Sequence, residues 1–184
     1  MNAQPGKLFV LSGPGGVGKS TIVEEIKKSD RFYFSVSATT RKPRIGEVDG
    51  VAYFFVTNEK FQEMIDENQF LEYADFAGHR YGTPKEPVLR ALESGKNVIL
   101  EIEIQGARQV KSVMPEAVMV FIAPPSIDDL MARLEGRGTD DPDRIKARLE
   151  LAQEEMAAAH EFDHILVNHR VEEVVAALVS LATS

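Results

Sequence analysis

The chain contains no cysteine among its 184 residues. Disulfide bonds, thiolate metal sites and cysteine nucleophiles are therefore excluded, and any catalysis must use other side chains. The chain also lacks an excess of positive charge, since 29 acidic residues against 21 basic ones give a formal net charge of −8. This balance argues against broad nucleic-acid binding, which usually needs a basic face, although a few local arginines and backbone N–H groups suffice for a small anionic ligand.

Long hydrophobic runs, internal repeats and low-complexity tracts are absent as well. The longest apolar stretches, near 117–123 and 174–182, fall far short of the roughly 20 residues that span a bilayer. The first residues lack a basic segment that leads into an apolar run, so no signal peptide is predicted. We therefore expect a cytoplasmic protein without a membrane partner or a nucleic-acid partner.

A chain of this length predicts one domain, or one core with small insertions. Its apolar fraction of 43% and charged fraction of 27% are ordinary for a globular enzyme. Short apolar runs alternate with helical patterns, which predicts an α/β fold whose parallel sheet is covered on both faces. The predicted strands lie at 8–11, 98–100, 118–122 and 165–167, and the helices at about 19–29, 85–94, 105–112, 126–135 and 171–182.

Two segments interrupt this alternation. From 34 to about 83 the pattern changes to short strands, near 51–56 and 70–73, around one helix that carries Phe61, Met64 and Ile65. We interpret this segment as a small mixed insertion beside the main sheet. The second segment, 135–143, is polar and rich in glycine, which predicts a mobile loop before a long helix around 145–156.

A phosphate-binding loop is the strongest motif. Residues 13–20 fit G-x-x-x-x-G-K-[ST] at every defined position, between a predicted strand and a predicted helix. Glycines let successive N–H groups point at phosphate oxygens, and the following helix adds its positive N-terminal end. Lys19 can reach the β and γ phosphates, and the Ser20 hydroxyl can ligate Mg²⁺. The predicted ATP-binding residues here are Gly13, Pro14, Gly15, Gly16, Val17, Gly18, Lys19, Ser20 and Thr21.

The insertion carries a second group of polar residues. Arg41 and Arg44 lie three apart beside a proline, and both can offer forked donors to a phosphomonoester. Together with motifs along the rest of the chain, these residues resemble the guanylate kinase family of bacterial type. The matching segments are the phosphate loop, SVSATTRKPRIGEVDG, the glutamate in FLEYA, HRYGTP, LEIEIQG, IAPPSIDDLMARLEGRGT and VNH.

The resemblance implies a P-loop nucleoside monophosphate kinase fold and the transfer of the γ-phosphoryl group of ATP to GMP, with dGMP as a weaker acceptor. It implies ATP and GMP as partners, Mg²⁺ as cofactor and no obligate protein partner. The implied P-loop core comprises 1–36, 85–124 and 151–184, the GMP-binding insertion 37–84 and the mobile lid 125–150.

By similarity, the acceptor site consists of Ser37, Arg41, Arg44, Tyr53, Glu72, Tyr81, Gly82, Thr83 and Glu103. Glu72 can accept hydrogen bonds from N1–H and the N2 amine of guanine, while the hydroxyls of Ser37 and Thr83 can donate to O6 or N7. Adenine lacks the N2 amine and has an acceptor at N1, so it leaves Glu72 unpaired, which is costly in a partly dry pocket.

By similarity too, arginines neutralise charge on the transferred group, since phosphoryl transfer depends on positioning and electrostatic stabilisation. The implied catalytic residues are Lys19, Arg41, Arg137 and Arg148, and Arg133, Arg137 and Asn168 complete the ATP site. Glu101 lies close to Mg²⁺, partly through water, and Glu103 faces GMP. The family more commonly has aspartate at the position of Glu103 and an acidic residue at that of His169.

Three alternatives stay open at this point. Residues 160–164 match H-E-x-x-H, the zinc-protease pattern, but they span the end of a helix and the start of a strand. Another small P-loop kinase, such as a ribose 1,5-bisphosphate kinase, keeps the fold and changes the acceptor. A non-catalytic guanylate-kinase-like module binds phosphopeptides instead. Such modules tend to lose nucleotide-site residues, whereas this chain retains Lys19, Ser20, Arg41 and Arg137.

Overall fold

The core of the protein is a five-stranded parallel sheet. The computed structural model describes residues 5–136 and 141–184. The strand order is β2, β7, β1, β8, β9, and every neighbouring pair runs parallel. The strands are β1 (Leu8–Ser12), β2 (Phe32–Phe34), β7 (Asn97–Glu101), β8 (Val118–Ala123) and β9 (His164–Val167).

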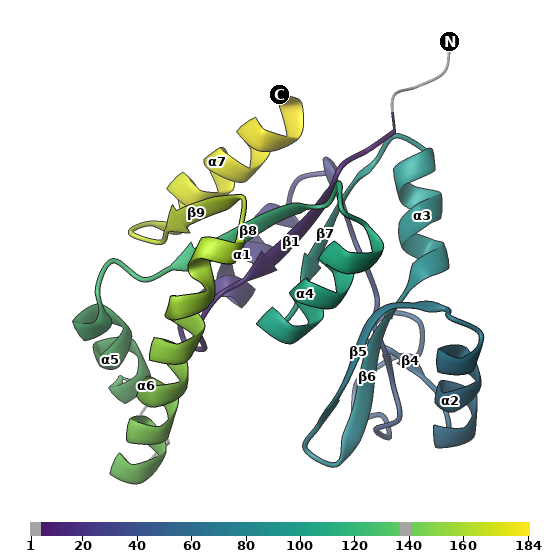
Figure 1. The fold of residues 1–184 in the computed structure, drawn as a ribbon, viewed down its shortest axis with the longest axis horizontal. Helices are drawn as coiled ribbons and strands as arrows, with labels where there is room; N and C mark the ends of the chain where they lie inside the picture. The colour runs from purple at the N-terminus through teal and green to yellow at the C-terminus, as the bar shows by residue number, and fades with distance from the viewer. Residues whose placement is uncertain (1–4, 137–140) are drawn as a thin grey trace.

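Helices cover both faces of this sheet, as Figure 1 shows. On β1, Leu8 and Val10 pack towards α3 (Lys85–Glu93) and α4 (Ile104–Val113). Phe9 and Leu11 pack towards α1 (Lys19–Ile26) and α7 (Val171–Thr183) on the opposite face. Each such side chain contributes about 1.5–3 kcal/mol when it is fully buried, so the apolar run of β1 holds the two helical layers on the sheet.

A second, four-stranded sheet forms the insertion. Its order is β4 (Phe54–Phe55), β3 (Ala38–Thr39), β6 (His79–Pro84), β5 (Phe70–Phe76), and β6 is antiparallel to both of its neighbours. Helix α2 (Asn58–Asp66) packs on it through Phe61, whose ring lies 4.6 Å from the Phe70 ring. Thr57 caps α2 by accepting a hydrogen bond from the Lys60 amide, which sets where the helix begins.

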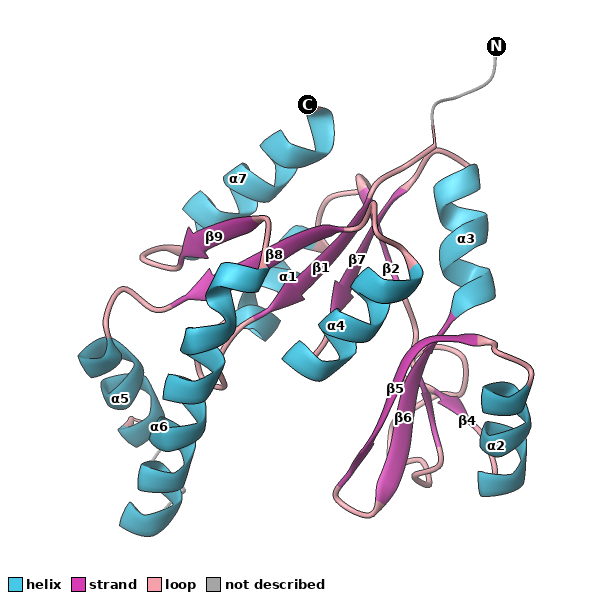
Figure 2. Ribbon diagram, in the orientation of Figure 1, coloured by secondary structure: helices cyan, strands magenta, loops and turns pink. Residues whose placement is uncertain are grey.

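Two helices follow β8 and lie on the other side of the core from the insertion. Helix α5 (Ile127–Glu135) is capped by Ser126, and α6 (Pro142–Ala157) by Asp141 with proline at its first position. They pack on each other through Leu130, Leu134 and Ala152. A short 3₁₀ helix, η1 (Ala158–Glu161), then leads into β9. Figures 1 and 2 show α5 and α6 on one side of the carboxyl ends of the core strands and the insertion on the other.

The predicted α/β fold is confirmed, and the differences are local. The sequence interpretation missed β2, which has three residues and too short a pattern to recognise. The strand predicted at 51–56 is present only at Phe54–Phe55. The amides of Val51 and Ala52 both donate to the Val48 carbonyl, so the chain turns there. Within the described residues, no helix combines the length and the apolar character needed to cross a bilayer.

Candidate active site

The phosphate loop connects β1 to α1 at the carboxyl edge of the core sheet. Gly13 has a φ of +148°, and a Cβ atom there would lie 2.3 Å from the Ile122 carbonyl oxygen. Gly18 precedes α1 with a φ of +100°, and a Cβ atom there would lie 2.8 Å from Asn168 Nδ2. Only glycine fits both positions, which explains two of the glycines that the motif requires.

Lys19 is the first residue of α1 and folds back across this loop. Its Nζ donates to the Gly13 carbonyl at 2.5 Å and to the Pro14 carbonyl at 3.2 Å. The first turn of α1 has no acidic residue, so the positive end of the helix is not offset by a carboxylate of its own first turn. The loop, the lysine and the helix end therefore form a site for a polyphosphate.

Ser20 and Glu101 are brought together although they lie far apart in the sequence. The Ser20 hydroxyl donates to Glu101 Oε1 at 3.1 Å, because β7 ends beside β1 and both side chains stand at the same edge. A hydroxyl and a carboxylate are hard oxygen ligands, so this pair fits Mg²⁺, which usually retains waters and substrate phosphates as its other ligands. Across 5–136 and 141–184, no cluster of three or more His, Cys, Asp or Glu residues is arranged to hold a metal.

Helix α5 is tied to the phosphate loop by Arg133. Its Nη1 donates to the Val17 carbonyl at 3.0 Å and its Nη2 to the Asn168 carbonyl at 3.1 Å. The Asn168 side chain, which is 3% exposed, donates from Nδ2 to the same Val17 carbonyl at 2.8 Å. In this structure the side chains of Arg133 and Asn168 both donate to the Val17 carbonyl of the phosphate loop. The sequence interpretation predicted instead that both residues contact ATP.

Glu155 on α6 is a site residue that the sequence analysis missed. Its carboxylate faces the Gly15 amide and Lys19, and it lies within electrostatic range of Glu103. Burial raises the pKa of Glu155, and the nearby negative charge of Glu103 raises it further. Glu155 belongs to a long helix with no motif around it, so the sequence held no signal for this contact.

Among the residues predicted to bind the acceptor, Glu72 is a buried carboxyl group at the junction of the insertion and the core. It is 8% exposed, and the Thr83 hydroxyl donates to its Oε1 at 2.7 Å. Burial raises the pKa of Glu72, and the hydrogen bonds from Thr83 partly oppose this shift. A Cβ atom on Gly106 of α4 would lie 2.8 Å from Glu72 Oε2, so the glycine leaves room for the carboxylate.

Strand pairing brings together the other predicted acceptor residues. Gly82 pairs with Ala38, and Tyr81 pairs with Thr39. Ser37, just before β3, accepts a hydrogen bond from the Phe54 amide through its carbonyl. In this structure the Thr83 hydroxyl is committed to Glu72, so donation from Thr83 to a base requires that hydroxyl to rotate.

Aromatic rings surround the first of the two arginines in the insertion. The Arg41 guanidinium lies over the Tyr53 ring at 5.3 Å and over the Phe55 ring at 5.8 Å. The Tyr53 and Tyr81 rings meet edge to face at 6.0 Å, and the Tyr81 hydroxyl lies against Arg41. Arg41, Tyr53 and Tyr81 therefore lie together as one group. That this group holds a phosphate stays a prediction.

The remaining predicted residues that the structure describes are exposed. Thr21 follows Ser20 in α1 and is exposed, Arg44 is exposed in a turn, and Glu103 is the exposed N-cap of α4. Arg148 is exposed on α6, a helix that lies on the other side of the core from the insertion in Figure 1. Arg137 lies outside the described residues.

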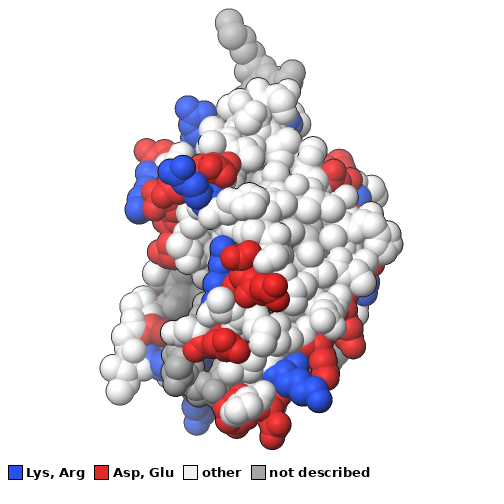
Figure 3. Space-filling view, turned by 90° about the vertical axis from the view of Figure 1, so that its left-hand side faces the viewer, with Lys and Arg blue, Asp and Glu red and all other residues white. Residues whose placement is uncertain are grey.

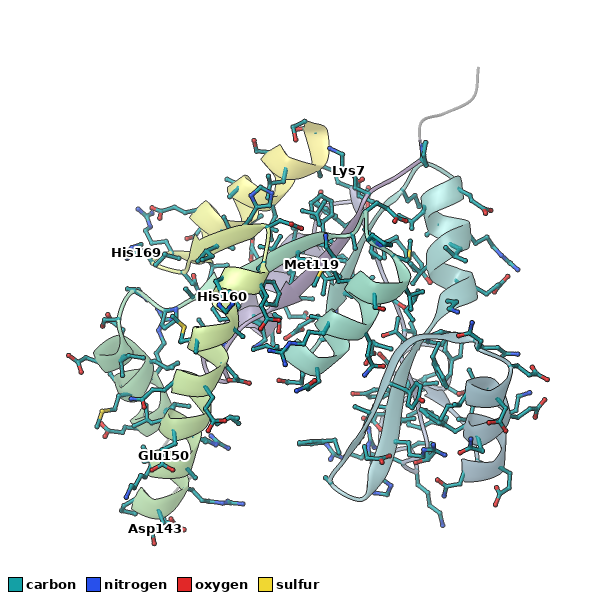
Figure 4. All side chains as sticks on the ribbon, viewed as in Figure 1. Lys7, Met119, Asp143, Glu150, His160 and His169 are labelled. Atoms are coloured by element: carbon teal, nitrogen blue, oxygen red, sulfur yellow. The ribbon has the colours of Figure 1, made fainter. Side chains whose placement is uncertain are left out.

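The zinc-protease pattern does not form a site. His160 belongs to η1 and His164 to β9, so the two histidines do not lie one turn apart on a helix. This confirms the expectation that the segment spans the end of a helix and the start of a strand. Figure 4 shows His160 at the end of α6 and His169 beyond β9. His160 Nδ1 lies 2.7 Å from the Ala157 carbonyl, which is a local contact at the helix end.

The surface charge has no single sign on the side that carries α5, α6 and β9. Figure 3 shows lysine, arginine, aspartate and glutamate interspersed around an area with few charged side chains. Among the described residues visible from this side, no continuous basic face is present. This distribution suits a small anionic substrate held in a pocket better than a long polyanion.

Comparisons with known proteins agree with this geometry. The family model described as "Guanylate kinase" matches residues 5–184. A guanylate kinase of Thermobifida fusca is 54% identical over 98% of this chain and 92% of that protein. One of Thermus thermophilus is 49% identical over 100% of this chain and 82% of that protein. The crystal structure of guanylate kinase from Anaplasma phagocytophilum superposes with a TM-score of 0.75 at 28% identity and covers 100% of this chain and 87% of that one.

Proposed function

The chain belongs to the guanylate kinase family, and we propose how its residues divide the work of moving the γ-phosphoryl group of ATP to GMP. The products are ADP and GDP. The fold is that of a P-loop kinase, with a parallel core sheet flanked by helices. Because transfer between two phosphates needs little covalent chemistry from the protein, the residues act through positioning and charge neutralisation.

The donor half binds ATP. The loop amides and the N-terminus of α1 surround the phosphates, and Lys19 exchanges its carbonyl partners at Gly13 and Pro14 for phosphate oxygens. Ser20 and Glu101 would hold Mg²⁺, Glu101 partly through water, and the ion would neutralise charge on the phosphates. Asn168 and Arg133 stabilise the loop conformation by donating hydrogen bonds to the Val17 carbonyl.

The acceptor half binds GMP. Glu72 accepts from N1–H and the N2 amine of guanine, and Ser37, Thr83 and Gly82 line the base. Arg41, Arg44, Tyr53 and Tyr81 hold the phosphate, and Glu103 faces the nucleotide from α4. The observation that carries this assignment is Glu72, because a carboxylate that is 8% exposed needs a donor-rich ligand at this place.

Closure completes the site. We assign the lid to 125–150 and the mobile acceptor segment to 37–84, and we assign Arg137 and Arg148 of the lid, with Arg41, to the charge that develops during transfer. In-line attack by the GMP phosphate on the γ-phosphorus breaks the bond to ADP, without a covalent enzyme intermediate. Closing also excludes water and so limits hydrolysis of ATP.

The test is a coupled ADP-release assay with Mg·ATP and five acceptors, namely GMP, AMP, CMP, UMP and ribose 1,5-bisphosphate. Rapid ADP release is expected with GMP among the five, and dGMP, assayed separately, is expected to react more slowly. Activity with ribose 1,5-bisphosphate in place of GMP would contradict the acceptor assignment, and silence with all five would favour a phosphopeptide-binding module. Location in the cytoplasm and independence from a protein partner stay predictions.

A further inference from the structure

A tight turn from Arg44 to Glu47 places the Glu47 carboxylate beside Arg41 and the Arg44 amide. The Glu47 amide donates to the Arg44 carbonyl at 3.0 Å, and Gly46 has a φ of +87°. A positive φ at the third position of such a turn favours glycine. The Arg44 amide in turn donates to Glu47 Oε2 at 2.7 Å, so the carboxylate and the turn hold each other.

Glu47 also forms a bidentate salt bridge with Arg41. Arg41 Nη1 donates to Oε2 and Nη2 donates to Oε1, each at 2.9 Å. The two side chains are only 12% and 22% exposed, unlike the ordinary surface ion pairs of this protein. Arg41 lowers the pKa of Glu47 to about 2, so the carboxylate stays charged at any pH near neutrality.

The donors of Arg41 can be counted. A guanidinium carries five N–H groups, and Glu47 takes two of them. The Lys42 carbonyl takes the second N–H of Nη1 at 2.9 Å. What is left is Nε–H and one N–H of Nη2, which lie parallel on one edge of the guanidinium and form a second fork. The Tyr81 hydroxyl lies beside the group, and the rings of Tyr53 and Phe55 pack against it.

We propose that Glu47 is a positioning residue for the acceptor phosphate, because it holds Arg41 by one edge and leaves the Nε/Nη2 edge to the phosphate. The same carboxylate sets the spacing to Arg44 through the turn. This inference rests on the proposed function, in which Arg41 and Arg44 bind the phosphate of GMP. The competing role is that of an anion that blocks Arg41 and must leave before GMP binds. The second fork favours positioning, since a phosphate bound there displaces neither Glu47 nor Lys42 and meets the Tyr81 hydroxyl, which already contacts Arg41.

Calorimetric titration with GMP and with guanosine separates the phosphate from the base. With Glu47→Ala, we expect GMP affinity to fall roughly 10- to 100-fold, since the loss of one charge-assisted hydrogen bond has an effect of this size. Guanosine affinity and the KM for ATP should stay unchanged. Glu47→Asp, which keeps the charge on a shorter side chain, should recover part of the loss.

A double-mutant cycle with Arg41 tests whether Glu47 acts through that arginine. In the Arg41→Ala background, Glu47→Ala should weaken GMP binding far less than it does in the wild-type protein. Glu63→Ala is the matched control, since Glu63 pairs with Lys60 on the exposed face of α2 in the same insertion. Thermal midpoints for all variants show which of them fold.

Unchanged GMP affinity in folded Glu47→Ala would overturn the inference. Tighter GMP binding would also overturn it and would establish the blocking role. An equal loss for guanosine would mean that Glu47 merely supports the fold of the insertion. These results differ from failure of the proposed function, which would be seen as absent ADP release with GMP in the wild-type protein.

Discussion

The Thr83 hydroxyl donates a hydrogen bond of 2.7 Å to the carboxylate of Glu72, on the strand that pairs with its own. This contact engages Oε1 of a buried carboxylate, whose Oε2 faces Gly106 of α4. A base with two adjacent donors supplies what the carboxylate lacks, whereas a base with an acceptor there leaves it unpaired.

Glu72→Gln should therefore weaken the preference for GMP over AMP. The amide replaces an acceptor with a donor, so it conflicts with N1–H or the N2 amine of guanine, and we expect kcat/KM for GMP to fall at least about 100-fold. Steady-state kinetics with both acceptors measure this. Equal losses for GMP and AMP would place the recognition of guanine elsewhere.

Glu72 should also make stability depend on pH. Burial raises its pKa in the folded state, so its favourable contribution is complete below the unfolded pKa of about 4.3 and is lost as the pH rises through the folded value. Glu72→Gln removes this loss. We expect the variant to gain stability over the wild-type protein between pH 4 and pH 8 in urea titrations. If the difference in unfolding free energy between Glu72→Gln and the wild-type protein did not change with pH, burial of Glu72 would not be its cause. The same would hold if Glu63→Gln showed an equal pH-dependent difference.

Lys19→Ala should lower turnover more than it weakens GMP binding. Lys19 lies at the phosphate loop. In the proposed mechanism it stabilises charge that develops during transfer and does not contact GMP. We expect kcat to fall roughly 100- to 1,000-fold, as on loss of one stabilising donor, with a smaller change in KM for GMP. Lys28→Ala, which removes an exposed lysine just beyond α1, is the control. Normal turnover in Lys19→Ala would refute the assigned role.

Arg133→Met should weaken ATP binding alone. The arginine braces the phosphate loop by donating to the carbonyls of Val17 and Asn168, and hydrogen bonds from a charged group are each worth about 1.5–3 kcal/mol. We expect the KM for ATP to rise about tenfold or more, while the KM for GMP stays constant. A rise in both constants would indicate that the brace supports the whole fold. Arg90→Met, at an exposed pair on α3, serves for comparison.

The hairpin between β5 and β6 offers a test of stability away from the site. Ala77 has a φ of +50° and precedes Gly78 in a two-residue turn, where asparagine or glycine is preferred. Ala77→Asn should raise the free energy of unfolding by about 1 kcal/mol, and Ala77→Val should lower it. Urea titration measures both. If both substitutions changed the free energy of unfolding in the same direction, the positive φ of residue 77 would not explain the effect.

Sequence patterns predicted the elements whose signal is local. The phosphate loop, α3, α4, α5 and the strands β1, β7 and β8 lie within one or two residues of their predicted positions, because each has continuous apolar runs or a defined motif. Strand β2 escaped notice because three residues carry too little pattern. Strand β4 was predicted too long because Val51 and Tyr53 are strand formers. The amides of Val51 and Ala52 instead donate to the Val48 carbonyl, so the chain turns there.

Candidate site residues could be selected from the sequence by their type and motif, but the hydrogen bonds between them could not be predicted. Arg41 and Ser20 stood out in their motifs, whereas the grip of Glu47 on Arg41 and the hydrogen bond between Ser20 and Glu101 depend on how the chain folds back. Glu155 reaches the phosphate loop only because α6 returns across it. Such contacts join segments far apart in the sequence, and no periodicity in one chain encodes them.

Strand β1 pairs on both sides with strands from the second half of the chain, Leu8 opposite Val98 and Phe9 opposite Val118. During synthesis, β1 and the phosphate loop behind it emerge from the ribosome long before either neighbour exists. The nucleotide site cannot assemble until β8 has left the exit tunnel, so nascent chains arrested before residue 118 should not be protected by ATP. Because closing such long loops is slow, the apolar β1 is the segment that a chaperone would meet first.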